Sequence, residues 1–266
     1  MSVCFYSKSA VANVGTGSGE RAPDVVTPAM QQLQAEVPNF RQQLSNFYTT
    51  GKILITLPVG DFCRHIVGGG SLIGERRLAY NNLLSGLVSE MRKQGAVGDG
   101  DSDSDGAAMQ LCFLSVEHAF HCAKLACVGQ FEKALCFEYH LCAPEAVGRV
   151  LSGAAIKAAG GRRGLYTLSP SERDTWAAAM PHVLKYLVVE KFTQNKDLQD
   201  MLCLTEGLEL RHIANPRKRA GSAEREQRWT WLEAHRDSIL QARLRAAQAA
   251  APAAPAADDE EVIVVE

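Results

Sequence analysis

Glu117 and Lys124 are the two residues whose types and spacing best suit bond-breaking chemistry in this chain. They stand seven residues apart in the segment 114–125, which is predicted to be one helix capped by Ser115. Seven residues are nearly two full turns of a helix, so the two side chains project from nearly the same face. Because a helix rises 1.5 Å per residue, they are about 10 Å apart along the axis. This separation is too long for a simple ion pair and wide enough to bracket part of a small molecule.

A carboxylate and a partly buried amine on one helix face can act on a molecule bound between them. Glu117 can stabilise positive charge that develops during a reaction, or activate an attacking group. Lys124 can lose its proton near apolar surface and so become a nucleophile. Other interpretations stay open: Glu117 as an acid favoured by the helix dipole, and Lys124 as a snorkelling side chain or a charged partner of a hydroxyl or phosphate.

Three consecutive residues, Ser45, Asn46 and Phe47, and one tryptophan, Trp176, are of types that contact nucleotides. The first three suit ribose hydroxyls and ring stacking, and an ordinary turn would explain them as well. Trp176 falls near the start of a predicted helix, where its ring can stack on a base or belong to the core. All four are therefore candidate ligand contacts.

Other charged side chains, and side chains of types that can bind a metal, give weaker evidence of function. Arg149 and Lys191 are the residues from which we expect phosphate contacts, with a solvated surface charge as the alternative for each. His118 and Cys122 stand four residues apart on one helix, but zinc needs three or four ligands and the sequence offers no second pair. We therefore expect no metal and no cofactor, and histidines that are hydrogen-bonded in the core or at its rim.

The composition narrows the class of protein. With 266 residues, 46% of them hydrophobic, the chain can form one large domain or two small ones. A net charge of -2 argues against nonspecific wrapping of duplex nucleic acid, but not against holding one modified nucleotide in a pocket. Neither a signal peptide nor a membrane-spanning apolar run is evident, so we expect a cytoplasmic or nuclear protein that is not secreted, with reduced cysteines.

The elements that must position these residues are expected to be mainly helices (α+β with a small sheet). We take residues 1–245 as a single domain, 64–110 as an insertion within it, and 246–266 as a disordered tail rich in alanine, proline and acids. Ser171 and Asp174 resemble a capping box at the start of the helix that carries Trp176. The remaining expected helices are 28–44, 75–93, 131–138, 144–151, 197–206 and 229–243. The expected strands are 3–6, 52–58 and 109–113.

The end of the tail contains a short apolar run behind four acidic residues, Val262-Ile-Val-Val265. This pattern resembles a SUMO-interacting motif, which adds a strand to the edge of its partner's sheet. An inert disordered tail is the alternative. A SUMO-like partner is thus an expectation for this segment.

Five segments, taken in order, resemble motifs of one known family. They are residues 5–7, 44–47, 116–124, 176–195 and 202–212. Together they make the chain similar to the NADAR domain family of YbiA-like N-glycosidases, over nearly all of its folded part. The resemblance implies a single YbiA-like helical domain in which Glu117 and Lys124 are catalytic. It also implies ligand contacts from Tyr6 and His118, besides the candidates already named.

One segment departs from the family pattern. Many members carry Asp-x-x-Trp-Gly before the last helix, whereas residues 214–219 here are Ala-Asn-Pro-Arg-Lys-Arg. If that segment closes the site in relatives, this chain must close its site differently.

The resemblance implies hydrolysis of an N-glycosidic bond to ribose. We expect the substrate to be ADP-ribosylated guanine in DNA or RNA, from which the enzyme removes ADP-ribose. Two alternatives stay open. One is the same chemistry on phosphoribosylamino-pyrimidine intermediates of riboflavin synthesis; the other is a non-catalytic module that binds ADP-ribose or a nucleotide.

Overall fold

The computed structural model of the chain describes residues 2–5, 28–46, 48–68, 72–95, 106–141, 147–150, 152–161, 164–213 and 226–250. This part is mostly helical with two small sheets, which confirms the expected class at that level. Several predictions fall outside the described residues and stay predictions. These are the contacts of Tyr6 and Phe47, the altered segment 214–219 and the motif at 262–265.

Two small sheets tie together segments far apart in the sequence. β1 (Ser2–Phe5) runs parallel to β4 (Glu209–Ile213), and β5 (Glu226–Arg228) pairs antiparallel with the other edge of β4. β2 (Ile55–Pro58) pairs antiparallel with β3 (Gln110–Phe113). The strands expected near residues 3, 55 and 111 are thereby confirmed. β4 and β5 were not expected, because a basic, polar stretch follows residue 211 and hides the short alternation before it.

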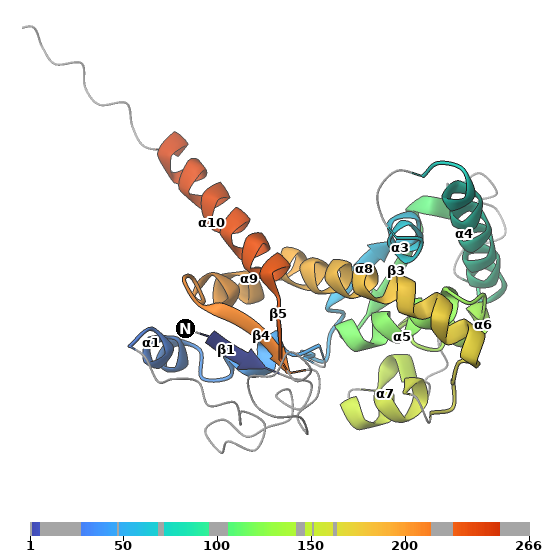
Figure 1. The fold of residues 1–266 in the computed structure, drawn as a ribbon, viewed down its shortest axis with the longest axis horizontal. Helices are drawn as coiled ribbons and strands as arrows, with labels where there is room; N and C mark the ends of the chain where they lie inside the picture. The colour runs from blue at the N-terminus through green and yellow to red at the C-terminus, as the bar shows by residue number, and fades with distance from the viewer. Residues whose placement is uncertain are drawn as a thin grey trace, which may run out of the picture.

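Helices make up most of the rest. The long helix α8 runs across the middle of the molecule, with β1, β4 and α10 towards one end and α3, α4 and α6 towards the other (Figure 1). α5 packs against α6, α7 and α8. The described helices are α1 (Pro28–Glu36), α2 (Phe40–Leu44), α3 (Val59–Ile66), α4 (Glu75–Lys93), α5 (Val116–Ala126), α6 (Phe131–Leu135), α7 (Gly153–Gly160), α8 (Pro170–Gln194), α9 (Lys196–Cys203) and α10 (Thr230–Ala250), with 3-10 turns η2 (Gly106–Ala108) and η3 (Val147–Arg149).

The start of α5 forms as its sequence predicts. Ser115 is the N-cap in extended conformation, and its hydroxyl oxygen accepts a hydrogen bond from the backbone N–H of His118. This bond satisfies a donor that the first turn of a helix otherwise leaves unpaired. The cap therefore fixes where α5 begins, and with it the position from which the Glu117 side chain projects.

The start of α8 differs from expectation. Ser169, not Ser171, is the N-cap, and its partner in the capping box is Glu172 rather than Asp174. The reason is Pro170, whose fixed φ and missing N–H suit the first helical position, so that the cap is Ser169, two residues before the expected Ser171. Trp176 accordingly lies two turns into the helix instead of one.

Residues 64–110, expected as an insertion, contribute to the core. α4 has the predicted bounds and packs against α3 and α6. Leu83, Leu87 and Met91 on its inner face are buried, whereas Leu78 near its start is 63% exposed. The buried face of α4 thus begins after its first turn.

The last helix runs beyond its expected end. α10 continues to Ala250, five residues into the range predicted to be tail. Alanine has the highest helix propensity, so the alanine-rich end extends the helix even though residues 241–250 are all exposed. None of the described helices is both long and apolar enough to cross a membrane.

Candidate active site around Glu117

Glu117 lies in the first turn of α5, where the carboxylate is only partly accessible. Its side chain is 15% exposed, and its backbone N–H donates to the carbonyl oxygen of Asn46 at 3.1 Å. This bond joins the segment after α2 to the start of α5. The structure thus brings together two of the regions, 45–46 and 117, that the sequence marked as candidate site residues.

Two further ionisable groups lie within electrostatic reach of this site. His212 on β4 has its pKa lowered to about 4, chiefly by burial; the negative charge of Glu117 opposes this shift and the positive charge of Lys157 on α7 adds to it. The imidazole of His212 also stacks on Trp229, with ring centroids 4.6 Å apart. α5, α7 and β4 therefore converge near the Glu117 carboxylate.

Sequence reasoning missed His212 and Lys157. Neither α7 nor β4 was predicted, and a lone histidine or lysine without an assigned element gives no spatial signal.

Lys124 is buried two turns further along α5. Its amine donates hydrogen bonds to the carbonyl oxygens of Gly160 and Tyr166, the latter at 3.1 Å. Burial lowers its pKa to about 8, an effect that the charge of Glu117 partly offsets. An amine with this pKa is partly neutral near pH 7.5, which a nucleophile requires.

The amine of Lys124 borders a cavity of about 300 Å³. Trp176 lines it as well, and its ring meets the ring of Phe120 edge to face at 4.9 Å. Lys124 and Trp176, from two separate helices, thus line the same cavity. The full lining is Phe120, His121, Lys124, Gly160, Gly161, Leu168, Arg173 and Trp176.

His121 stands between the carboxylate and this cavity. Its Nε2 lies 3.3 Å from Oε1 of Glu117, and its ring also lines the cavity. The close approach of α7 depends on Gly160, because a Cβ there would lie 2.4 Å from the imidazole. Sequence reasoning treated His121 only as a core or rim histidine.

Lys191 does not lie where a phosphate contact requires it. It is fully buried, and its amine donates to the carbonyl oxygens of Gln43 and Ser45, the latter at 2.9 Å. Burial lowers its pKa to about 7. The expected phosphate contact is therefore wrong for this arrangement: Lys191 supports the chain at Ser45, which is itself buried, just before Asn46.

His118 and Arg149 do not line the cavity. His118 is fully buried; its Nδ1 is 2.8 Å from Oγ of Ser115, and its Nε2 lies 3.0 Å from the carbonyl oxygens of Val147 and Val150. Burial lowers its pKa to about 4. The neutral ring donates from Nε2 and holds η3 in place, so it is not available to a ligand.

Arg149, in η3, donates from Nε to the carbonyl oxygen of Tyr139 and lies over the ring of that tyrosine. Its guanidinium is thus part of an exposed contact with Tyr139, and the structure does not join it to the Glu117 site. Over the described ranges there is no group of three or more His, Cys, Asp or Glu side chains able to hold a metal ion.

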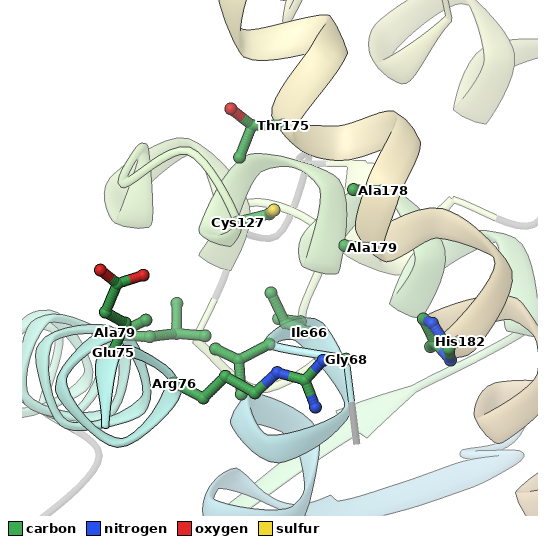
Figure 2. A pocket seen from close by; sticks show the side chains of 12 residues that line it. Ile66, Gly68, Glu75, Arg76, Ala79, Cys127, Thr175, Ala178, Ala179 and His182 are labelled. Atoms are coloured by element: carbon green, nitrogen blue, oxygen red, sulfur yellow. The ribbon is translucent and has the colours of Figure 1, made fainter. Parts of the chain in front are cut away.

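A separate cavity of about 440 Å³ lies between the end of α3, the start of α4 and α8. Figure 2 shows Arg76 extending from α4 beneath it and His182 facing it from α8, with Cys127 above. Its lining contains none of the residues that the sequence singled out.

Searches of known protein families, curated proteins and solved structures found no match to this chain. The case for function therefore depends on the geometry and on the motifs.

Proposed function

We propose that this protein is an N-glycosidase that removes ADP-ribose from ADP-ribosylated guanine in nucleic acid. The observation that carries the proposal is the placement of Glu117. Its partly buried carboxylate lies near the junction of three elements and beside a cavity that holds a low-pKa amine. The motifs shared with the NADAR family support the same chemistry.

Glu117 would act on the sugar. Breaking the bond between ribose C1 and the guanine nitrogen leaves positive charge on the ring, and a fixed carboxylate in a partly dry site lowers the free energy of that state. The Ser115 cap and the hydrogen bond to Asn46 hold the backbone of Glu117 in place. A carboxylate that need not reorganise during the reaction stabilises the transition state most effectively.

Lys124 would supply the nucleophile. Its neutral amine attacks C1 as the bond to guanine breaks, while guanine takes up a proton; ring opening then gives an imine, which water hydrolyses to free ADP-ribose and the amine. A pKa of about 8 leaves part of the amine neutral at physiological pH. To react, the amine must leave the carbonyl oxygens of Gly160 and Tyr166.

Binding groups would come from the same surroundings. Trp176 offers an aromatic wall in the cavity, and Asn46, whose backbone carbonyl is bonded to Glu117, is a candidate contact through its side chain. Tyr6, Phe47 and the SUMO-like partner of Val262-Ile-Val-Val265 remain proposals that rest on motifs alone. The proposal needs neither metal nor cofactor and places the protein in the cytoplasm or nucleus.

A second candidate function is a reader that binds ADP-ribose or a nucleotide without turnover. The observation that favours it is the bonding of Lys124, whose amine is held by two backbone carbonyl oxygens. A lysine held in this way can serve as a fixed positive charge for a ligand.

A substrate panel separates these functions. Purified protein would be incubated, with chelator present, with an oligonucleotide carrying ADP-ribosyl-guanine and separately with a phosphoribosylamino-pyrimidine. We expect the protein to release ADP-ribose from the oligonucleotide, and chromatography measures this release. Cleavage of the pyrimidine compound alone would shift the substrate to the riboflavin intermediates, and tight binding of the oligonucleotide with both compounds intact would establish the reader.

A further inference from the structure

His121 is a buried histidine whose ring nitrogens have no hydrogen bond among the described residues. The residue is 5% exposed, and neither Nδ1 nor Nε2 presents surface to solvent. Nδ1 lies on the side of Gly160, where a Cβ would come within 2.5 Å of it, and Nε2 lies 3.3 Å from Oε1 of Glu117. Buried polar atoms in proteins are nearly always paired, so a bond to at least one of these nitrogens is expected.

The surroundings of the two nitrogens decide which of them carries the proton of a neutral ring. A neutral imidazole has one N–H donor and one acceptor nitrogen. A proton on Nδ1 would find no acceptor among the described residues, whereas a proton on Nε2 has a carboxylate oxygen next to it. Because an unpaired buried donor is costly, the proton belongs on Nε2, on the side of Glu117.

The imidazole itself cannot easily turn. Its ring centroid lies 5.9 Å from that of Phe120 and 5.4 Å from that of Phe137. On the side of α7, the ring has room only because residue 160 is a glycine, since a Cβ there would lie 2.4 Å from Cγ of the imidazole. The donor is therefore fixed, and any adjustment between the two groups falls to the carboxylate.

The carboxylate of Glu117 is free to make this adjustment. Its side chain is 15% exposed, and over the described ranges no other basic side chain lies within ion-pair distance of it. The amine of Lys124, on the same helix, donates instead to the carbonyl oxygens of Gly160 and Tyr166. Rotation about the side-chain bonds of Glu117 can thus turn the 3.3 Å approach, which lacks hydrogen-bond geometry, into an aligned bond to a charged acceptor.

We propose that His121 is a positioning residue, whose Nε2–H donates a hydrogen bond to the carboxylate of Glu117 and fixes the direction in which it points. The inference rests on the proposed function and adds to it a residue that acts through Glu117. The Ser115 cap and the bond to Asn46 hold only the backbone of Glu117. A carboxylate stabilises developing charge best when it is preorganised, so the histidine supplies the constraint on the side chain that the backbone cannot.

Kinetics with the ADP-ribosylated oligonucleotide test this role in the full chain through three replacements. His121→Gln places an amide nitrogen at the position of Nε2, His121→Asn places one at the position of Nδ1, and His121→Phe keeps a flat ring without nitrogens. We expect His121→Gln to keep kcat within about threefold of wild-type protein. The other two should lose about tenfold or more in kcat, with KM and Tm close to wild type, because the misdirected carboxylate affects the chemical step alone.

Two kinetic results would overturn the proposal. One is an equal kcat in wild-type protein and all three variants. The other is a loss in His121→Gln as large as that in His121→Asn, since a donor at the position of Nε2 would then have no particular value.

NMR of the ring protons tests the hydrogen bond without turnover. A buried, hydrogen-bonded Nε2 proton exchanges slowly enough with water to be observed in protein with isotope-labelled histidine. We expect this proton in wild-type protein, and we expect its resonance to move upfield in Glu117→Gln, because an amide oxygen is a weaker acceptor than a carboxylate. A ring without a proton on Nε2, or a resonance that does not respond to Glu117→Gln, would contradict the proposal.

The two ideas can therefore fail separately. Turnover by wild-type protein with an equal kcat in every His121 variant would remove the positioning role alone. The Nε2 resonance with its response to Glu117→Gln, in a protein without turnover, would support the hydrogen bond and remove the N-glycosidase alone.

Discussion

Two buried lysines, Lys124 and Lys191, have similar bonding but different roles. Burial lowers the pKa of Lys124 to about 8 and that of Lys191 to about 7, and both amines donate to backbone carbonyl oxygens. Only Lys124 borders a cavity, and only its pKa is affected by Glu117. The difference in surroundings, and not in pKa, makes Lys124 the candidate for chemistry and Lys191 a support for the segment at Ser45.

Replacing Lys124 by arginine tests whether the amine must be neutral. Arginine keeps the positive charge but does not deprotonate in proteins. If Lys124 attacks as a free amine, wild-type turnover rises with pH up to about 8 and then levels off, and Lys124→Arg is as inactive as Lys124→Ala. The pH dependence of kcat measures this. An active Lys124→Arg variant with a flat profile would instead show that the residue acts as a charge.

At single residues, the sequence was most informative where an element was also recognised. Glu117, Lys124 and Trp176 could be selected because their helices are clear, and the structure places them around one region. His118 looked equally suitable, but its ring is buried against the carbonyl oxygens of Val147 and Val150. A polar residue that satisfies core carbonyls has the same sequence signal as one that faces a ligand. His212 and Lys157 require contacts between distant segments, which spacing cannot reveal.

Among the helices, the start of α8 positions Trp176 and offers a sharp comparison. Ser169 and Glu172 form both hydrogen bonds of a capping box, whereas Ser171 lies within the first turn. Ser169→Ala should therefore lower the free energy of unfolding by about 1 kcal/mol. Ser171→Ala, the control, should lower it by less than half as much. Chemical denaturation of both variants measures the difference, and equal losses would contradict the assignment of the cap.

Element boundaries followed the sequence where the signals were local. α4 and the cap of α5 could be predicted from apolar periodicity and a serine N-cap. α7 was missed because an alanine- and glycine-rich run lacks the alternation of polar and apolar residues that marks an amphipathic helix. The end of α10 was placed too early because proline and acids further on masked the helix propensity of its alanines.

The molecule as a whole is closed by pairing of its first strand with one near the end of the domain. β1 pairs with β4, and Phe5 on β1 meets the rings of both His212 and Trp229 edge to face. Segments more than 200 residues apart in the sequence, β1 and β4, thus form one side of the site. Such long-range pairing, like the β4–β5 hairpin, depends on the global arrangement and was not available from periodicity.

Two neutral histidines, His118 fully buried and His212 partly buried, make overall stability sensitive to acid. His118 and His212 each have a pKa lowered from 6.5 to about 4, so the unfolded chain binds more protons between these values. The free energy of unfolding should therefore fall as the pH decreases from about 6.5 to 4, by up to about 3 kcal/mol for each histidine. Carboxylates with lowered pKa values, such as Glu209, add to this loss as the pH falls below about 4.5.

Urea unfolding at several pH values measures this loss, and His118→Gln is the informative variant. Without a titrating ring next to η3, its unfolding free energy should depend less steeply on pH in this window. Parallel curves for the variant and wild-type protein would contradict the assignment to His118.

The central claim is that Glu117 in this chain cleaves the bond between ADP-ribose and guanine. The most direct measurement is the rate of ADP-ribose release from a single-stranded oligonucleotide carrying ADP-ribosyl-guanine, by wild-type protein and by Glu117→Gln, in the presence of chelator. The account predicts release by wild-type protein and a loss of about 100-fold or more in the variant, with an unchanged Tm, because the amide cannot stabilise the developing charge. Release at equal rates by both proteins, or none by wild-type protein, would contradict it.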